Sequence, residues 1–406
     1  MKSILQIFAS RRMALMLPLG FSAGIPLALT AGTLQAWISS ESIDIKTIGL
    51  FNLVGLPYTY KFLWAPFLDR YFPGVLGRRR GWMLWAQLLL IASIIAMAFS
   101  DPKQNIGLMA VLAVCVAFFS ATQDIVIDAF RTESLKTEEY GAASGVYIMG
   151  YRLAMLTSGA LALILADHMS WKAVYLLMAA CLSVGLIATI FSNEPVSERP
   201  PRTLKEAVVE PFLDYFKRTA SIEILFFVFL YKLDSAIASS LMTKFFLDLG
   251  FSKTDIGLVI KTFGLAATIV GALAGGVLIP KMGLGRALLI FGILQGATNL
   301  LFYWMTMAGS NRIALIVTIA GENLAGGMGT AAYAAFLMGL CNKRFTAFQY
   351  ALLTSVMALP ARLVGGFTGY LQDGVGWQNY FIIATLVSIP GLLMLKRFKN
   401  WKYEST

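Results

Sequence analysis

Apolar residues lie in long runs along the chain, separated by short polar turns. A run of about 20 apolar residues is long enough to cross the hydrocarbon core of a bilayer as one helix. The pattern predicts twelve such helices, over residues 12–39, 46–69, 81–100, 105–130, 140–166, 170–192, 221–248, 254–280, 285–308, 311–340, 345–372 and 376–396. The longest polar interruption follows the sixth run. We therefore predict an all-α integral membrane protein of two six-helix bundles, residues 1–192 and 221–406, joined by a cytoplasmic linker over 193–220.

The composition is typical of a membrane protein, and the distribution of charge predicts its orientation. Hydrophobic residues make up 58% of the chain and charged residues only 14%, against about 25% charged residues in soluble domains. If the N-terminus is cytoplasmic, 22 of the 33 Lys and Arg residues fall in cytoplasmic segments and about five on the opposite side. This bias follows the positive-inside rule and places both termini in the cytoplasm. The net charge of +11 thus indicates orientation, and we expect no nucleic-acid partner.

The two halves of the chain repeat each other, which is typical of transporters. Residues 139–159, EYGAASGVYIMGYRLAMLTSG, align without gaps to residues 349–369, QYALLTSVMALPARLVGGFTG, and this alignment superposes Arg152 on Arg362. The repeat predicts a pseudo-symmetric pair of bundles related by an axis along the membrane normal. Both arginines could then face one central ligand.

The loop after the second predicted helix, APFLDRYFPGVLGRRRGW, resembles a loop motif of the major facilitator superfamily. The motif pairs an Asp and an Arg with a basic cluster, here Asp69, Arg70 and Arg78. The leading glycine of the motif is replaced by Ala65 or Pro66, and extra residues precede the basic cluster. We interpret the loop as a gating element that braces helices in one access state. A basic loop that only sets topology is the alternative.

Two carboxylates, Asp124 and Asp128, lie inside the fourth apolar run. A charged side chain at the bilayer centre costs roughly 3 kcal/mol on insertion scales, so charged residues inside the spans must face one another or water. The spacing of four places both carboxylates on one helix face, where two negative charges cannot both stay ionised cheaply. We expect one of them to carry a proton. Alternatively, Asp128 pairs with Arg131.

Other polar residues inside the predicted spans are candidates for substrate binding. Arg152 and Arg362 offer planar forks that suit carboxylates, or they pair with Asp124 and Glu322. Tyr58 and Tyr60 flank Lys61 and could stack on sugar faces. The predicted proton-coupling residues are Asp124, Asp128 and Glu322. The predicted substrate-binding residues are Lys61, Gln123, Arg152, Arg362, Tyr58, Tyr60, Tyr151, Lys232, Asp234, Lys261 and Asn323.

Motifs of enzymes and cofactor sites are absent from the sequence. It contains no G-x-S-x-G, no H-E-x-x-H and no phosphate-binding P-loop, and the three cysteines form no metal or disulfide pattern. We expect a transporter that uses protons as its coupling ion, with no metal and no other cofactor. The alternative of a different class is a membrane-embedded transferase that uses Asp124 and Asp128 as catalytic groups near one membrane surface.

The first predicted helix and the segment around the two carboxylates resemble one family. LPLGFSAGIPLALTAGTLQAWISS, residues 17–40, and TQDIVIDAFR, residues 122–131, resemble the muropeptide permeases, AmpG, of the major facilitator superfamily. The resemblance implies import of N-acetylglucosaminyl-1,6-anhydro-N-acetylmuramic acid and its peptides across the bacterial cytoplasmic membrane, driven by protons. It also implies roles in peptidoglycan recycling and β-lactamase induction. An acetyl-coenzyme A transporter of the same superfamily is the alternative, and we expect a monomer surrounded by lipid.

Overall fold

A computed structural model of the chain describes residues 10–41, 43, 51–74, 76–195, 203–252, 255, 259, 262–365 and 367–401. The structure is helical, and within these ranges ten helices are long and apolar enough to cross a membrane. They are Arg11–Ser40, Arg78–Ala98, Ile106–Ser134, Thr137–Ala166, Trp171–Phe191, Ser221–Asp248, Gly264–Met282, Leu284–Ala308, Arg312–Gly339 and Thr368–Trp401. Each overlaps a predicted span, although Thr368–Trp401 begins within the predicted span 345–372 and bends at Gly376, whose backbone is not helical. Of the two other predicted spans, 46–69 contains shorter described segments, and 345–372 contains one helix of 20 residues, Thr346–Gly365.

The chain divides into two compact units. The first comprises residues 1–136, 146–212 and 341–355, and the second comprises residues 137–145, 213–340 and 356–406. Each unit therefore takes in a short piece of the opposite half of the chain. These limits do not coincide with those of the two predicted bundles, whose boundaries at 192 and 221 stay a prediction.

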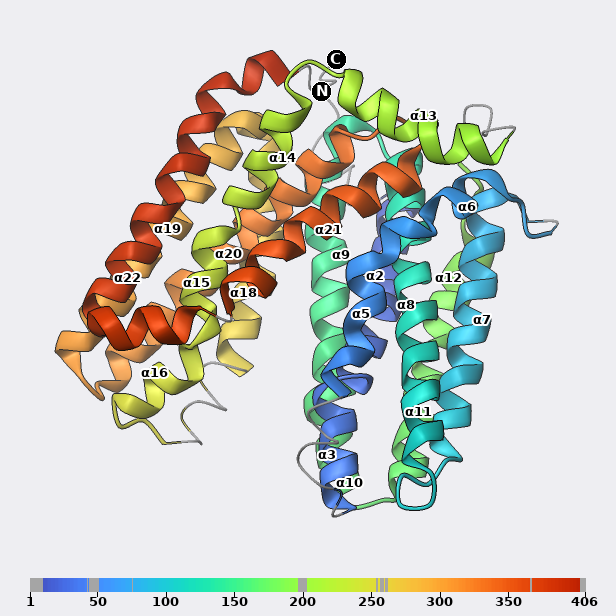
Figure 1. The fold of residues 1–406 in the computed structure, drawn as a ribbon, viewed down its shortest axis with the longest axis horizontal. Helices are drawn as coiled ribbons and strands as arrows, with labels where there is room; N and C mark the ends of the chain where they lie inside the picture. The colour runs from blue at the N-terminus through green and yellow to red at the C-terminus, as the bar shows by residue number, and fades with distance from the viewer. Residues whose placement is uncertain are drawn as a thin grey trace. The chain divides into compact units, whose positions relative to one another are not determined.

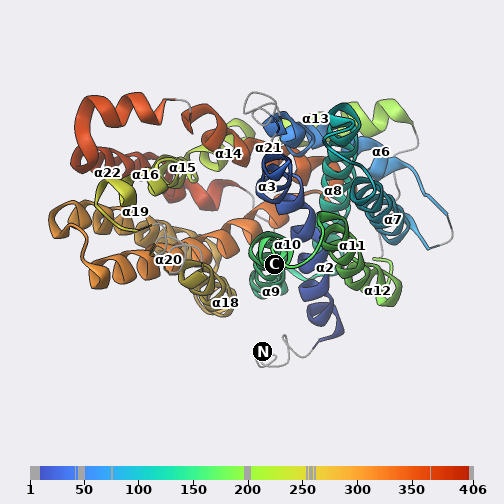
Figure 2. The ribbon, with the colours of Figure 1, turned by 90° about the horizontal axis from the view of Figure 1, so that it is seen from below.

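The first unit is built around α7 and α8, which pack side by side along their lengths (Figures 1 and 2). α2 lies against α8 and α12. A core of apolar side chains, including Leu90, Ile94 and Met178, fills the space between these helices. The helices of this unit are α2 (Arg11–Leu29), α3 (Gly32–Ser40), α5 (Leu56–Tyr60), α6 (Ala65–Arg70), α7 (Arg78–Ala98), α8 (Ile106–Ser134), α10 (Ala162–Ala166), α11 (Trp171–Cys181) and α12 (Ser183–Phe191).

The second unit has α18, α19, α20 and α22 as its long helices. α20 packs against both α18 and α19, and α19 also packs along α22 (Figure 1). Aromatic rings dominate one core cluster, in which Phe381 contacts Phe245 and stacks on Phe302. The helices of this unit are α14 (Ser221–Leu230), α15 (Leu233–Ser240), α16 (Met242–Asp248), α18 (Gly264–Met282), α19 (Leu284–Ala308), α20 (Arg312–Gly339) and α22 (Thr368–Met394).

Three helices contribute residues to both units. They are α9 (Tyr140–Met155), α13 (Leu204–Lys217) and α21 (Thr346–Gly365). α9 continues into a π-helical turn, Leu156–Leu161, which begins four residues after Arg152. Such turns are frequent at functional sites.

The second predicted span is broken into short segments instead of forming one continuous helix. Between Phe51 and Arg70 the chain alternates two 3₁₀ turns, Phe51–Gly55 and Lys61–Leu63, with α5 and α6. Pro57 and Pro66 are the second residues of α5 and α6, in the first turn of each helix, where the missing N–H of proline is tolerated, although it would interrupt a longer helix. The predicted first and seventh spans also break, after Leu29 and after Leu230.

Candidate functional site

α8 brings the predicted motif residues into the interior of the first unit. Gln123 is fully buried and donates a hydrogen bond of 3.1 Å from its amide nitrogen to the Ser22 hydroxyl of α2. α12 also approaches this hydroxyl closely, because a Cβ on Gly185 would lie 2.2 Å from it. The side chain of Gln123 therefore joins two helices, and its predicted role in substrate binding stays a prediction.

Asp128 forms a buried ion pair with Arg131, one helical turn along α8. The guanidinium nitrogen lies 3.0 Å from the Asp128 carboxylate, and both side chains are largely buried. Arg131 also places its guanidinium 3.8 Å from the centre of the Tyr147 ring, a favourable cation–π geometry. This is the second of the two interpretations of Asp128 that the sequence allowed. The ion pair satisfies the charge of Asp128 within the protein.

Asp124 has different surroundings from those of Asp128. Its Oδ1 atom is buried and has no hydrogen-bond partner among the described residues. The positive charge of Lys61 acts on Asp124, as does the negative charge of Asp128. The Tyr58 and Tyr151 hydroxyls also interact electrostatically with the Asp124 carboxylate. A buried carboxylate oxygen without a partner is rare in folded proteins and commonly marks a functional group.

Lys61 lies at the break in the second predicted span. Its side chain is only 8% exposed, and its charge acts on both Asp124 and Asp128. Trp64 fixes this segment to α8 through a 3.0 Å hydrogen bond from its indole nitrogen to Thr122. The predicted contact Lys61 therefore lies near both acids and Tyr58 lies near Asp124, whereas Tyr60 is half exposed.

The predicted substrate contacts in the second half of the chain occupy several helices. The Lys232 ammonium donates a 3.3 Å hydrogen bond to Thr330 and lies over the Tyr333 ring. The Asn323 amide donates to the Glu322 carboxylate at 2.8 Å and accepts a hydrogen bond from Thr268. Lys261 and the side chain of Arg362 lie outside the described residues.

A second cluster of charges lies in the first unit, at the ends of α6, α7 and α8. The Arg79 side chain donates hydrogen bonds to Asp69 at 2.7 Å and to Glu133 at 3.0 and 3.1 Å, and all three side chains are buried. Arg78 reaches the same Glu133 carboxylate at 3.3 Å. Arg70, which the sequence grouped with Asp69 and Arg78, instead lies over the ring of Tyr71.

The first residues of α21 complete this charge cluster. The Asp69 carboxylate accepts hydrogen bonds from the backbone N–H groups of Ala347 and Phe348, at 3.3 and 3.0 Å. The Thr346 hydroxyl donates to Glu133 at 2.8 Å. A carboxylate at the start of a helix satisfies backbone N–H groups that have no partner within the helix, and it interacts favourably with the helix dipole. The cluster therefore connects segments that are more than 200 residues apart in sequence.

Sequence reasoning missed Glu133 and Thr346 as members of this cluster. Glu133 stands near the end of α8 in the segment RTES, where a charged residue is expected at a helix end facing water. The sequence around Glu133 does not indicate that its carboxylate is buried, because its partners lie in distant segments of the chain. The basic run at residues 78–80 was the available signal for Arg79.

Comparisons with known proteins identify the family. The sequence profile of the Major Facilitator Superfamily matches residues 16–232 and 224–402. The anhydromuropeptide permease of Escherichia coli K12 is 48% identical over 394 residues, covering 96% of this chain and 80% of that protein. The chain belongs to the anhydromuropeptide permease family of the major facilitator superfamily. The family resemblance expected from the first and fourth spans is therefore confirmed, and the chain is a membrane permease and not an enzyme.

Other relatives extend over nearly the whole length of the chain. An uncharacterised protein of Haemophilus influenzae is 40% identical over 403 residues, covering 96% of this chain and 95% of that protein. A putative transporter, AmpG 4, of Rickettsia felis is 33% identical, covering 97% of both chains. The permease family thus aligns with both halves of the chain.

Solved structures confirm the predicted fold class. The transporter FucP in its outward conformation matches with a TM-score of 0.70 at 13% identity, covering 95% of this chain and 97% of that one. The proton:xylose symporter XylE matches with a TM-score of 0.71 at 10% identity, covering 97% of this chain and 95% of that one. At such low identity these similarities show the fold alone.

Proposed function

We propose that this permease imports N-acetylglucosaminyl-1,6-anhydro-N-acetylmuramic acid and its peptides from the periplasm to the cytoplasm together with protons. The observation that carries proton coupling is the buried Asp124 oxygen without a partner, beside Lys61, while Asp128 is neutralised by Arg131. The substrate class is supported by the 48% identity to a protein named anhydromuropeptide permease. The imported muropeptides would be used in peptidoglycan recycling and would provide the signal for β-lactamase induction.

The two carboxylates have different surroundings, which support different roles in the proposal. A carboxylate that alternates between protonated and ionised forms needs partners that tolerate both forms. Asp128 has a dedicated guanidinium 3.0 Å away, which favours the ionised form throughout. Asp124 has no Lys or Arg within ion-pair distance in the described ranges, and Lys61 acts on it from farther away. We therefore assign the coupling proton to Asp124 and a structural role to Asp128.

Lys61 connects proton binding with substrate binding in this proposal. While Asp124 is ionised, the ammonium of Lys61 is attracted to it; once Asp124 is neutral, that charge becomes available to an anionic substrate. Tyr58 and Tyr151 lie near the same carboxylate, and their rings could stack on the apolar faces of the sugars. Arg152 and Arg362 would contact the peptide carboxylates. Protonation would thus strengthen binding of the anion.

The cluster of Asp69, Arg79 and Glu133 is proposed to act as the gating element. It holds the start of α21 through charge-assisted hydrogen bonds, which are roughly twice as strong as neutral ones. Alternating access requires such contacts to form in one state and to break in the other. The cluster would therefore set the relative stability of the two states and would not touch substrate.

Uptake into proteoliposomes tests the proposal directly. Labelled anhydro-disaccharide tripeptide is supplied outside, an inward proton gradient is imposed, and accumulation is measured with and without a protonophore. We expect protonophore-sensitive accumulation by the wild type and by the control Asp167→Asn, whose side chain is exposed. Asp124→Asn should lose accumulation against a gradient. Full accumulation by Asp124→Asn would remove its coupling role, and uptake of acetyl-coenzyme A in place of the muropeptide would overturn the substrate.

A further inference from the structure

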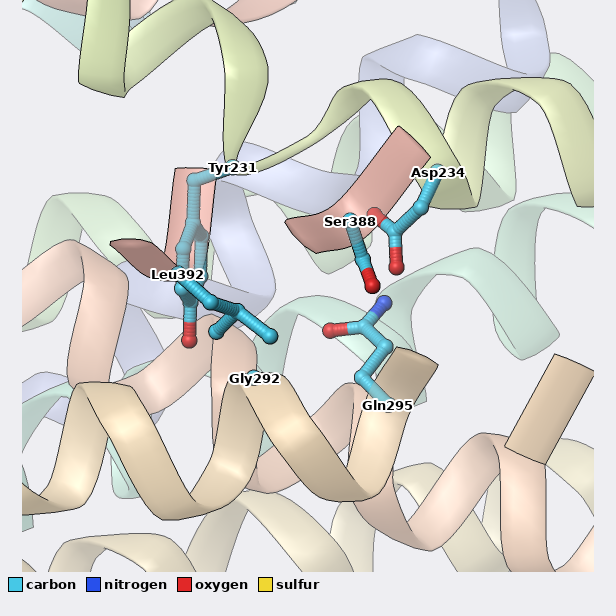
Figure 3. Close-up of a pocket in the computed structure, with 6 residues that line it drawn as sticks. All are labelled: Tyr231, Asp234, Gly292, Gln295, Ser388 and Leu392. Atoms are coloured by element: carbon cyan, nitrogen blue, oxygen red, sulfur yellow. The ribbon is translucent and has the colours of Figure 1, made fainter. Parts of the chain in front are cut away.

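A small cavity in the second unit lies where the seventh predicted span is interrupted. α14 ends at Leu230 and α15 begins at Leu233. Figure 3 shows the Asp234 carboxylate, the Ser388 hydroxyl and the Gln295 amide pointing into one space. The residues that line the cavity are Tyr231, Asp234, Gly292, Gln295, Ser388 and Leu392. Interrupted helices are where transporters commonly place ion sites, because the break exposes polar groups inside the membrane.

Asp234 is the charged residue of this cavity, and it is only 3% exposed. In the part of the chain that the structure describes, no Lys or Arg nitrogen lies within 4 Å of its carboxylate. The Ser235 hydroxyl donates a 3.3 Å hydrogen bond to it, and Asp234 lies in the first turn of α15. Asp234 therefore differs from Asp128, whose carboxylate is held by Arg131.

Each element packed against α15 contributes groups that lie near Asp234. From the end of α14, Tyr231 acts on Asp234 electrostatically, and its hydroxyl donates to the Leu288 carbonyl at 2.9 Å. Lys232 also acts on the carboxylate, although its ammonium bonds to Thr330. α19 contributes Gln295, whose amide donates to Ser235. α22 contributes Ser388 and, farther along, Tyr380, which donates to the Ile237 carbonyl.

We propose that Asp234 is a second proton-binding site of the permease, separate from Asp124. This inference rests on the proposed proton-coupled function. The first turn of α15 and Ser235 stabilise the ionised carboxylate, whereas burial without a counter-ion favours the neutral acid. These opposing influences suit a group that must both take up and release a proton. Movement at the break between α14 and α15 would admit water, from which a carboxylate oxygen takes a proton and to which it later returns it.

The cavity suits a proton better than a metal cation. Hard cations take about six or more oxygen ligands. Here the Tyr231 hydroxyl is already bonded to Leu288, and much of the wall is formed by Leu392, Gly292 and the Tyr231 ring. Figure 3 also shows the amide nitrogen of Gln295, which cannot ligate a cation, facing Ser388. A single proton on Asp234 needs no additional ligands.

Infrared difference spectroscopy of the purified permease tests this site without any substrate. As pH is raised, each protonated carboxyl that ionises loses its acid C=O band. We expect the wild type and the control Asp248→Asn to show one band that Asp234→Asn lacks. Asp248 ends α16 and its side chain is 37% exposed. The same set of bands in Asp234→Asn and wild type overturns the proposal, as does a band displaced by sodium chloride but not by choline chloride.

Transport stoichiometry tests whether the proton at Asp234 moves during the cycle. We expect Asp234→Asn to retain exchange of substrate across proteoliposome membranes and to move one proton fewer per substrate than the wild type. An unchanged ratio overturns the coupling role, and loss of both exchange and substrate binding identifies Asp234 as a substrate contact instead. If the wild type transports no muropeptide, the proposed function fails while the infrared result stands.

A second variant covers the case in which Asp234→Asn does not fold. Ser235→Ala removes the hydroxyl that donates a hydrogen bond to the Asp234 carboxylate. Because the frequency of an acid C=O band depends on hydrogen bonding around the acid, we expect this variant to shift the band assigned to Asp234. Ser239→Ala is the matched control on α15, since its hydroxyl bonds to the Ser235 carbonyl. Bands that are identical in Ser235→Ala and wild type contradict the proposal.

Discussion

Asp124 and Asp128 are one helical turn apart on α8, but their carboxylates have different surroundings. Asp128 is paired with Arg131 at 3.0 Å, and the guanidinium in turn lies on the Tyr147 ring. The Oδ1 atom of Asp124 is buried and has no hydrogen-bond partner within the described ranges. At the scale of single residues, these surroundings support the proposed division, with Asp128 in a structural role and Asp124 carrying the proton.

Loss of Arg131 should destabilise the protein strongly. Arg131→Met leaves the buried carboxylate of Asp128 without its counter-ion, and removal of one partner of a buried ion pair typically costs about 3–5 kcal/mol. We expect a clear decrease in the unfolding temperature of the purified permease in detergent, measured by the fluorescence of its tryptophans.

The double variant Asp128→Asn/Arg131→Met distinguishes this ion pair from general packing. It removes the uncompensated charge, so we expect it to recover most of the stability lost in Arg131→Met. If the double variant is no more stable than the single one, the ion pair contributes little and the loss comes from the cation–π contact with Tyr147 or from packing.

The sequence was sufficient to find the two acids, but not their partners. A carboxylate inside an apolar run is visible directly, and the spacing of four places Asp124 and Asp128 on one face. The pairing of Asp128 with Arg131 was one of two alternatives, because a spacing of three also fits an exposed pair at a helix end. The burial of Glu133 depends on Arg79 and Thr346, which are far away along the chain and therefore could not be found from the local pattern.

At the scale of helices, glycines allow α2 and α9 to pack closely. A Cβ on Gly150 would lie 2.2 Å from the Leu17 carbonyl oxygen, and a Cβ on Gly20 would lie 2.2 Å from the Tyr147 carbonyl oxygen. Both atoms belong to backbone, which cannot move aside without moving the helix. Close packing through small residues is the usual way in which membrane helices associate.

Gly150→Ala should therefore separate α2 from α9 and destabilise the protein. Overpacking of this kind typically costs about 1–3 kcal/mol, and we expect a lower unfolding temperature in detergent. Gly159→Ala is the matched control in the same predicted span, because the nearest atom to its added Cβ is the Ala28 Cβ at 3.8 Å. Equal stability of the two variants would show that α2 and α9 are not tightly packed in the membrane protein.

The positions of the long helices followed from hydropathy, whereas their interruptions did not. An apolar run must be long enough to cross the bilayer, and for this reason all ten long helices of the described residues overlap predicted spans. The break at Lys61 arises from two prolines and from packing against α8, and the break after Leu230 contains neither glycine nor proline. Tertiary contacts decide such breaks, so composition alone predicted a continuous helix in both places.

At the scale of the whole molecule, the cluster of Asp69, Arg79 and Glu133 should control the rate of the transport cycle. Asp69→Asn removes a charge from hydrogen bonds to the start of α21. Hydrogen bonds to charged groups contribute about 1.5–3 kcal/mol each, enough to shift an equilibrium between two states by roughly tenfold to a hundredfold. We expect initial uptake rates to decrease by at least about tenfold, with substrate affinity in binding assays unchanged.

Arg70→Gln provides the comparison for the gating cluster. Arg70 lies beside Asp69 in sequence but contacts the Tyr71 ring, so we expect uptake near the wild-type rate. A loss of rate in Arg70→Gln equal to that in Asp69→Asn would show that the charge of the loop, and not the buried cluster, is what matters. A large change of substrate affinity in Asp69→Asn would place Asp69 in the binding site.

The net charge moved in each cycle decides how the membrane potential acts on uptake. One net positive charge moving inward is worth about 2.3 kcal/mol per 100 mV, and a tenfold change of concentration corresponds to about 1.4 kcal/mol. If each anionic muropeptide enters with one proton more than its own negative charge, its accumulation should rise tenfold for about every 60 mV of inside-negative potential. Potassium diffusion potentials set with valinomycin in proteoliposomes measure this slope.

Substrates of different charge then show whether the number of protons carried in each cycle is fixed or varies with the substrate. With a fixed number of protons, a muropeptide that carries one more negative charge should enter without net charge, so its accumulation should not respond to potential. If both substrates give the same slope, additional protons accompany the additional charge. A fixed number is expected if the protons bind to Asp124 and Asp234, because the chain supplies both carboxylates whatever peptide is carried. Equal slopes would instead mean that protons enter on the substrate itself.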